Sequence, residues 1–129
     1  MVKRGFKQML AEANAHIASL SIAEAIPLVG DAGTVFVDVR ETAKLQQAGM
    51  IEGAIHAPRG FLEFIADPEG AMHNPSFVHA KKLVIYYASG GRSTLATRTL
   101  QEMGYANAVN LTGGFAAWRQ ANGPTTAKS

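Results

Sequence analysis

The stretch from residue 84 to residue 93 most constrains what this chain can fold into. It reads Val-Ile-Tyr-Tyr-Ala-Ser-Gly-Gly-Arg-Ser, an apolar run that passes through small residues into a helical pattern. Such a run predicts a β-strand, a tight loop and a helix in direct succession. The loop N–H groups and the helix N-terminus would point into one concavity, which predicts an oxyanion cradle rather than a turn whose glycines serve only backbone angles. The residues of this cradle are Ala88, Ser89, Gly90, Gly91, Arg92 and Ser93.

The same order of strand and helix recurs along the chain. Apolar and β-branched runs predict strands over residues 34–39, 54–57, 82–87 and 108–111. Helical spacing predicts helices over residues 6–18, 41–48, 61–66, 92–103 and 114–122, with a long surface connection over 67–80. Strands that alternate with helices predict a parallel sheet covered on both faces, with its site at the carboxyl ends of the strands.

The length of 129 residues fits one domain with a single core. We expect a lead-in helix within residues 1–18, the main domain over 19–123 and a tail over 124–129. Three basic residues among the first seven predict a solvated tail rather than a nucleic-acid-binding arm. No apolar run reaches membrane-spanning length and the N-terminal segment lacks the apolar stretch of a signal peptide, so we expect a cytoplasmic protein with no nucleic-acid or membrane partner.

The sequence contains no cysteine. Disulfides and thiolate metal sites are therefore excluded for this chain, and the usual nucleophile of sulfur chemistry at such a loop is missing. The histidines His16, His73 and His79 lack the spacing of a metal site. From these residues we expect no metal site.

Four segments resemble the rhodanese family of sulfurtransferases. The loop is similar to the family's active-site loop, Tyr-Cys-x-x-Gly-x-Arg-Ser, with Tyr87 at the cysteine position. Residues 37–41 resemble the strand-ending Asp-x-Arg of the family, residues 53–60 its Gly-Ala-x-His-x-Pro-x-Gly segment, and residues 111–118 its Gly-Gly-x-x-x-Trp ending. The resemblance extends from about residue 21 to residue 118.

The resemblance implies an α/β fold, a rhodanese-like three-layer α/β/α domain with a parallel central sheet of about five strands. In active members of the family a cysteine persulfide transfers a sulfane sulfur, without a metal or an organic cofactor. A phenol with a pKa near 10 is protonated at neutral pH and cannot form a persulfide. With Tyr87 in the nucleophile position, we expect the chain to be inactive as a persulfide sulfurtransferase, with no catalytic residue, and to retain a binding loop.

The remaining candidate residues each allow more than one interpretation. Tyr87 plugs the space of a substrate, forms a recognition surface for a partner, or has no role. Arg92 resembles the substrate-side arginine of the family, and the alternative is a solvent-facing charge at a helix end. We expect Asp38 and Arg40, at the end of a buried strand, to form a structural ion pair rather than to catalyse. We expect His56 to be a hydrogen-bonded structural histidine rather than a general base.

The leading hypothesis is a binding module whose loop takes a small oxyanion (thiosulfate, sulfate or phosphate) or an unidentified protein partner. One alternative is a sulfurtransferase role in the broad family sense, in which a partner supplies the thiol. Another is a structural or oligomer-forming domain, whereas a phosphatase would again need a thiolate at position 87. Phe61, Phe64 and Ile65 are expected to pack the domain, the other interpretation being an exposed apolar rim around the loop.

Overall fold

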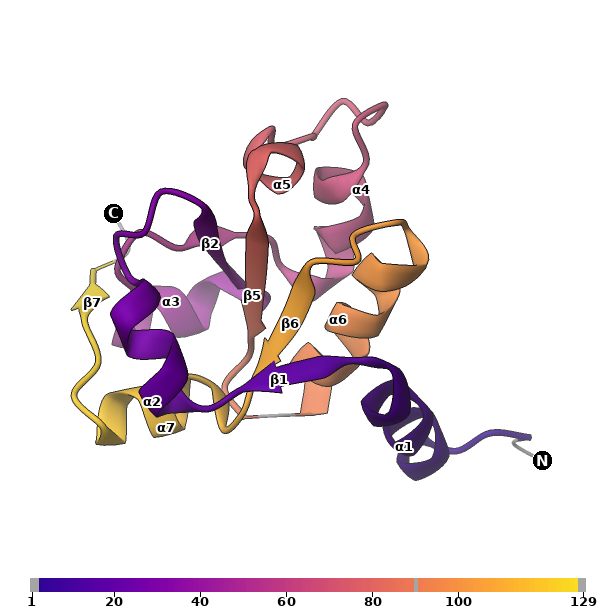
Figure 1. Cartoon of the computed structure of the whole chain (residues 1–129), viewed down its shortest axis with the longest axis horizontal. Helices are drawn as coiled ribbons and strands as arrows, with labels where there is room; N and C mark the ends of the chain where they lie inside the picture. Colours follow the sequence, from indigo (N-terminus) through magenta and orange to yellow (C-terminus); the bar gives the residue numbers. More distant parts are fainter. Residues whose placement is uncertain (1–2, 90, 128–129) are drawn as a thin grey trace.

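The centre of the protein is a parallel β-sheet of five strands in the order β1-β6-β5-β2-β4 (Figure 1). The computed structural model describes residues 3–89 and 91–127. The strands of the sheet are β1 (Ala18–Leu20), β2 (Thr34–Asp38), β4 (Ile55–His56), β5 (Lys82–Tyr86) and β6 (Ala108–Leu111). This architecture confirms the parallel α/β fold that the sequence predicts. The edge strand β1 is an addition to that prediction, because three residues are too few to show a strand pattern.

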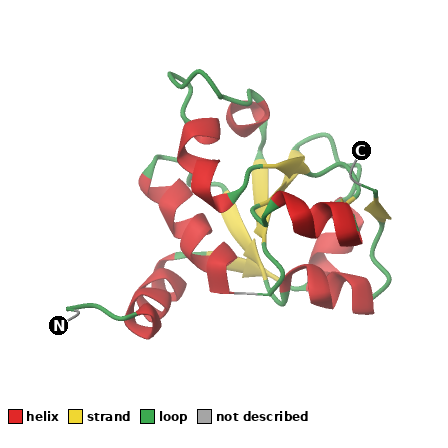
Figure 2. Ribbon diagram, turned by 180° about the vertical axis from the view of Figure 1, so that it is seen from behind, coloured by secondary structure: helices red, strands yellow, loops and turns green. Residues whose placement is uncertain are grey.

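Helices lie on both sides of the sheet, which makes the three layers visible from behind in Figure 2. They are α1 (Phe6–His16), α2 (Ile22–Ala25), α3 (Thr42–Ala48), α4 (Leu62–Ala66), α5 (Ser76–His79), α6 (Gly91–Glu102) and α7 (Gly114–Gln120), with the 3₁₀ turns η1 (Ile26–Leu28) and η2 (Arg59–Phe61). The start of α2 is a capping box, in which the Ser21 side chain accepts from the Glu24 N–H while the Glu24 carboxylate accepts from the Ser21 N–H.

The alternation of side chains along β5 divides the core into two clusters. Leu83 and Ile85 belong to the cluster that α4, α5 and α6 cover, whereas Val84 and Tyr86 belong to the cluster that α2 and α7 cover. Trp118 of α7 is fully buried in the second cluster, where its ring meets the ring of Phe36 edge-on at 5.6 Å between centroids. A strand that is apolar on both faces therefore fixes β5 in the middle of the sheet.

A second, two-stranded sheet lies outside the sequence prediction. The strands β3 (Met50–Ile51) and β7 (Thr125–Thr126) pair antiparallel. The N–H of Glu52 and the indole N–H of Trp118 both donate to the carbonyl of Pro124, at 3.1 and 3.0 Å. The segment 124–129, expected to be a tail, thus includes a strand that pairs with the body of the domain. Two-residue strands carry no periodicity, so sequence patterns do not reveal them.

Two expectations about the segment after β4 are wrong. Residues 67–80 are not a plain surface connection, because they include α5, whose Phe77 is fully buried. Phe61 and Phe64 do not pack the core either, since 50% and 59% of their surfaces are exposed. The short helix α4 turns Leu62 and Ala66 inward instead, and Ile65 packs against the core only in part.

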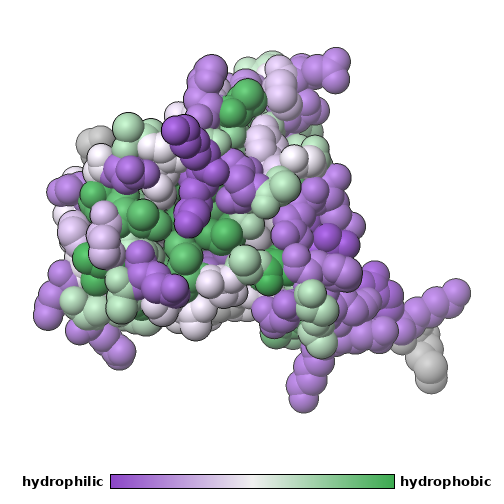
Figure 3. Space-filling view, viewed as in Figure 1, coloured by the Kyte–Doolittle hydropathy of each residue, from purple (hydrophilic) through white to green (hydrophobic). Residues whose placement is uncertain are grey.

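Hydrophobic residues also show on one face of the molecule. In the space-filling view they gather left of centre, over α2 and the strands beside it, while hydrophilic residues cover the side where α1 lies (Figure 3). Ile22, Ile26, Leu28 and Val29 are partly buried and pack against the second cluster. Among the residues described, none of the helices has the length and apolar character needed to span a bilayer.

Candidate functional site

The candidate site is the loop that leads from β5 into α6. Tyr87 directly follows the last residue of β5, and Arg92 lies in the first turn of α6. Gly90, which the sequence also assigns to the loop, lies outside the described residues. The loop sits at the carboxyl edge of the sheet, at the bottom of the view in Figure 1. That is the edge at which parallel α/β folds place their ligands.

The start of α7 holds the loop in place through backbone hydrogen bonds. The N–H of Phe115 donates to the carbonyl of Tyr87 at 2.8 Å, and the N–H of Ala116 donates to the carbonyl of Ala88 at 3.1 Å. Gly114 makes this approach possible: it has φ +61°, and a Cβ there would lie 2.5 Å from the Tyr87 carbonyl oxygen and 2.8 Å from that of Ser89. Gly114 therefore supports the loop, a role that sequence reasoning does not assign to it.

Tyr87, Arg92 and a third residue, Glu41, form a polar cluster at the loop. The Tyr87 hydroxyl donates to the two carboxylate oxygens of Glu41 at 3.3 and 3.2 Å. Nη1 of Arg92 donates to Oε1 of Glu41 at 2.8 Å, and the guanidinium carbon lies 5.3 Å from the centroid of the Tyr87 ring. The arginine that the sequence proposes as an anion ligand thus already contacts an internal carboxylate.

Sequence reasoning misses Glu41, which it treats only as the start of a helix. The available signal is its place directly after the Asp-x-Arg motif, which starts at the last residue of β2. Because β2 pairs with β5 in parallel, both strands end at the same edge of the sheet. Glu41, three residues beyond β2, and Tyr87, directly after β5, are therefore brought to one place.

The protonation states in this cluster follow from its contacts. Partial burial, then the hydrogen bond to Glu41 and its negative charge, raise the pKa of Tyr87 above the ordinary value of 10.0. The pKa of Glu41 is lowered, chiefly by a hydrogen bond from its own backbone N–H and further by Tyr87 and Arg92. At neutral pH the cluster holds a neutral phenol, a carboxylate and a guanidinium, so Tyr87 is not an activated nucleophile.

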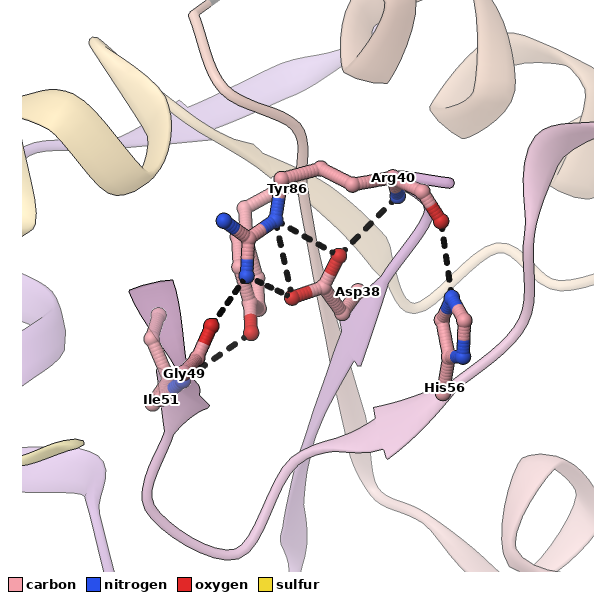
Figure 4. A network of polar contacts seen from close by, with 6 residues as sticks. All are labelled: Asp38, Arg40, Gly49, Ile51, His56 and Tyr86. Atoms are coloured by element: carbon pink, nitrogen blue, oxygen red, sulfur yellow. Dashed lines mark hydrogen bonds and ion pairs between the residues drawn. The ribbon is translucent and has the colours of Figure 1, made fainter. Parts of the chain in front are cut away.

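Asp38 and Arg40 lie beneath this edge as a buried ion pair (Figure 4). Nη2 of Arg40 donates to Oδ2 of Asp38 at 2.7 Å and to the carbonyl of Gly49, also at 2.7 Å. The backbone N–H of Arg40 donates to Oδ1 of the same aspartate at 2.9 Å. Only 3% of the arginine side chain and none of the aspartate side chain is exposed. The ion pair that the sequence predicts is present, and solvent does not reach it.

Aromatic rings and a histidine complete this network. The Arg40 guanidinium carbon lies 4.1 Å from the centroid of the Phe115 ring and 5.8 Å from that of Tyr86. The hydroxyl of Tyr86 accepts from the N–H of Ile51 at 3.0 Å, and burial followed by the charge of Asp38 raises the pKa of Tyr86 far above its ordinary value. Nε2 of His56 lies 2.7 Å from the carbonyl oxygen of Arg40. The network ties β2, β3, β4 and α7 together below the loop.

The other predicted loop residues differ in how far they are exposed to solvent. Ser93 is buried in the first turn of α6, and its carbonyl accepts from the Thr97 hydroxyl at 2.7 Å, whereas Ser89 is exposed. The ring of Phe6, from α1, borders the loop, 3.5 Å from where a Cβ on Gly91 would lie. Within residues 3–89 and 91–127, no three acidic or histidine side chains are grouped so that they could hold a metal ion.

A comparison with known protein families shows which family the chain belongs to. Residues 21–121 match the model of the rhodanese-like domain. The chain belongs to the rhodanese-like family. The match begins at the capping residue of α2 and includes β2, the loop and α7, so the site described above lies wholly inside the family region.

Individual relatives of this rhodanese-like domain carry sulfurtransferase names. A mitochondrial protein of Schizosaccharomyces pombe, provisionally named a thiosulfate sulfurtransferase, is 34% identical over 94 residues, which are 69% of this chain and 66% of that protein. The chloroplast thiosulfate sulfurtransferase 16 of Arabidopsis thaliana is 31% identical over 122 residues, which are 92% of this chain and 100% of the relative. The domain thus spans about two thirds of the first relative and the whole of the second.

A solved structure from Rhodopseudomonas palustris is similar to nearly the whole domain. It is 42% identical, covers 98% of this chain and 97% of its own, and superposes with a TM-score of 0.92. That protein is described as one of unknown function and a possible tyrosine phosphatase. The similarity therefore extends beyond the family region to residues before position 21.

Proposed function

We propose that this rhodanese-like domain binds a small oxyanion at the loop between β5 and α6 and does not carry sulfur as a persulfide. The observation that supports binding is the placement of Arg92 in the first turn of a 12-residue helix that opens at the carboxyl edge of the sheet. Helix N-termini and guanidinium groups both favour oxyanions. Thiosulfate, sulfate and phosphate are the candidate ligands.

The lack of persulfide chemistry rests on the residue at position 87. The chain has no thiol, and Tyr87 stands where the resemblance places the cysteine. Its phenol is held neutral by burial and by Glu41, which raise its pKa. A phenol offers oxygen and not sulfur, so it cannot form the sulfur–sulfur bond of a persulfide.

The purified protein is expected to produce no thiocyanate from thiosulfate and cyanide above the rate of a buffer blank, because no residue can carry the sulfur. The assay is a colorimetric measurement of thiocyanate over a range of protein concentrations. Thiocyanate production that rises with protein concentration and survives repurification would overturn the absence of persulfide chemistry.

Arg92→Ala is expected to weaken sulfate binding about tenfold. A hydrogen bond to a charged group contributes about 1.5–3 kcal/mol, and the half-exposed position of Arg92 favours the lower end of that range. The measurement is a titration with sulfate, followed by the amide chemical shifts of the loop. Lys81→Ala is the matched control, since it removes one exposed positive charge at the opposite end of β5. Equal losses in the two variants would remove Arg92 from the site.

The names of the relatives favour a second candidate, sulfur transfer in which a partner supplies the thiol. In that case the protein would accelerate release of sulfide from thiosulfate by an added dithiol, and Arg92→Ala would slow it. A structural or oligomer-forming domain would show neither this acceleration nor sulfate binding. A cysteine-dependent phosphatase activity has no support, because the chain offers no thiolate.

A further inference from the structure

We propose that the Glu41 carboxylate competes with external anions for the hydrogen-bond donors of the loop, and that its charge weakens the binding of dianions more than that of monoanions. This inference rests on the proposed oxyanion function. An external anion that binds Arg92 through Nη1 displaces the Glu41 carboxylate from that nitrogen. Glu41 then determines both how tightly anions bind and how strongly the site distinguishes monoanions from dianions.

The hydrogen-bond donors of the cluster support this assignment. The guanidinium of Arg92 and the hydroxyl of Tyr87 are two side-chain donors at the loop, and both donate to Glu41 at 2.8 to 3.3 Å. An oxyanion that binds Arg92 through Nη1 competes with Glu41 for the same nitrogen. The carboxylate thus occupies the place of a ligand, although it belongs to the chain.

The exposure of the pair makes the displacement easy. The side chains of Arg92 and Glu41 are 56% and 54% exposed. Exposed ion pairs of this kind contribute little stability, because water and salt screen them. A soluble anion can therefore exchange with Glu41, whereas it could not displace a buried carboxylate such as Asp38.

The displaced carboxylate still repels the ligand. Its charge stays at the site on a flexible side chain, and Coulomb repulsion grows in proportion to the charge of the ligand. A dianion such as sulfate is repelled about twice as strongly as a monoanion such as nitrate. Glu41 therefore weakens the binding of dianions more than the binding of monoanions.

Glu41→Gln keeps the shape of the side chain and removes the charge. It is expected to raise the affinity for nitrate about threefold and for sulfate about tenfold, because the logarithm of the gain doubles with the ligand's charge. Titrations of the wild type and the variant with the two sodium salts, at constant ionic strength and with loop amide shifts as the readout, give both affinities. Glu69→Gln is the matched control, since it removes an exposed carboxylate from the connection between α4 and α5.

The ionisation of Tyr87 gives a second readout that needs no bound anion. Because Glu41 raises the pKa of this phenol, Glu41→Gln is expected to lower it, as followed by ultraviolet difference absorbance. The same titration of Tyr87→Phe identifies the contribution of Tyr87 among the three tyrosines of the chain. An unchanged phenol pKa in Glu41→Gln would show that the cluster does not form in solution, and would overturn the inference.

The outcomes separate the two proposals. If wild type and Glu41→Gln bind sulfate equally well, or if Glu69→Gln gives the same gain, Glu41 is not a competitor while the oxyanion function stands. If neither protein binds sulfate or nitrate, both proposals fail. Sulfate binding by the wild type that becomes tighter in Glu41→Gln, together with a lowered Tyr87 pKa, supports both. Sulfate binding in Glu41→Gln alone supports the role of Glu41 and overturns the oxyanion function of the wild-type loop.

Discussion

Tyr87→Cys is expected to introduce a reactive thiol and to give the protein measurable thiosulfate sulfurtransferase activity. The new side chain would start at the end of β5, where Phe115 already fixes the carbonyl of residue 87, and would face the first turn of α6. The positive end of a 12-residue helix and the guanidinium of Arg92 both stabilise a thiolate. The pKa of the thiol should therefore lie below the ordinary value of about 8.5.

Alkylation by iodoacetamide as a function of pH measures this pKa, and thiocyanate production measures the activity. Ala121→Cys is the matched control, because it places an exposed thiol at the C-cap of α7, where the helix dipole disfavours a thiolate. Adding Glu41→Gln to Tyr87→Cys is expected to lower the thiol pKa further, since it removes the nearby carboxylate. If the thiol at position 87 is alkylated no faster than the one at position 121, and no thiocyanate forms, then the loop is not preorganised for an anion.

The sequence predicts the framework of the site because the signals that define it are local. Continuous apolar runs identify β2 and β5 as buried strands, and small residues before a helical pattern identify the loop after β5. The rule that ligands lie at the carboxyl ends of parallel strands then locates Arg92 and Tyr87 at one edge. These steps need no knowledge of distant contacts.

The parts that sequence reasoning misses depend on distant contacts. Glu41 meets Tyr87 and Arg92 across 46 and 51 positions of sequence, and only the pairing of β2 with β5 brings them together. The pairing of β3 with β7 likewise joins segments that are too short to show a pattern. Phe64 is misassigned because helical spacing alone does not tell which side of a five-residue helix faces the core.

Arg40→Ala is expected to lower the free energy of unfolding by about 3–5 kcal/mol, because it leaves the buried carboxylate of Asp38 without its cation. It also leaves the carbonyl of Gly49 without a donor and removes the guanidinium packed on the ring of Phe115. A domain of this size has a total stability of about 5–15 kcal/mol, so the loss is a large fraction of it. Urea unfolding followed by the fluorescence of the single tryptophan, Trp118, measures the change.

Two further variants test whether the buried charge causes the loss. Arg4→Ala breaks the exposed pair with Glu12 and is expected to change the free energy of unfolding by at most about 1 kcal/mol. The double variant Asp38→Leu/Arg40→Met removes both buried charges and is expected to be more stable than Arg40→Ala, because no carboxylate is then left unpaired. Equal losses in Arg40→Ala and Arg4→Ala would contradict the role of the network.

The same substitution links the buried network to the loop. Arg40 packs against the ring of Phe115, and the N–H of Phe115 holds the carbonyl of Tyr87. Arg40→Ala is therefore expected to broaden or shift the amide resonances of Ala88 and Ser89 under conditions where the protein remains folded. Arg4→Ala should leave those resonances in place. Resonances that are unchanged in both variants would mean that α7 positions the loop without help from the ion pair beneath it.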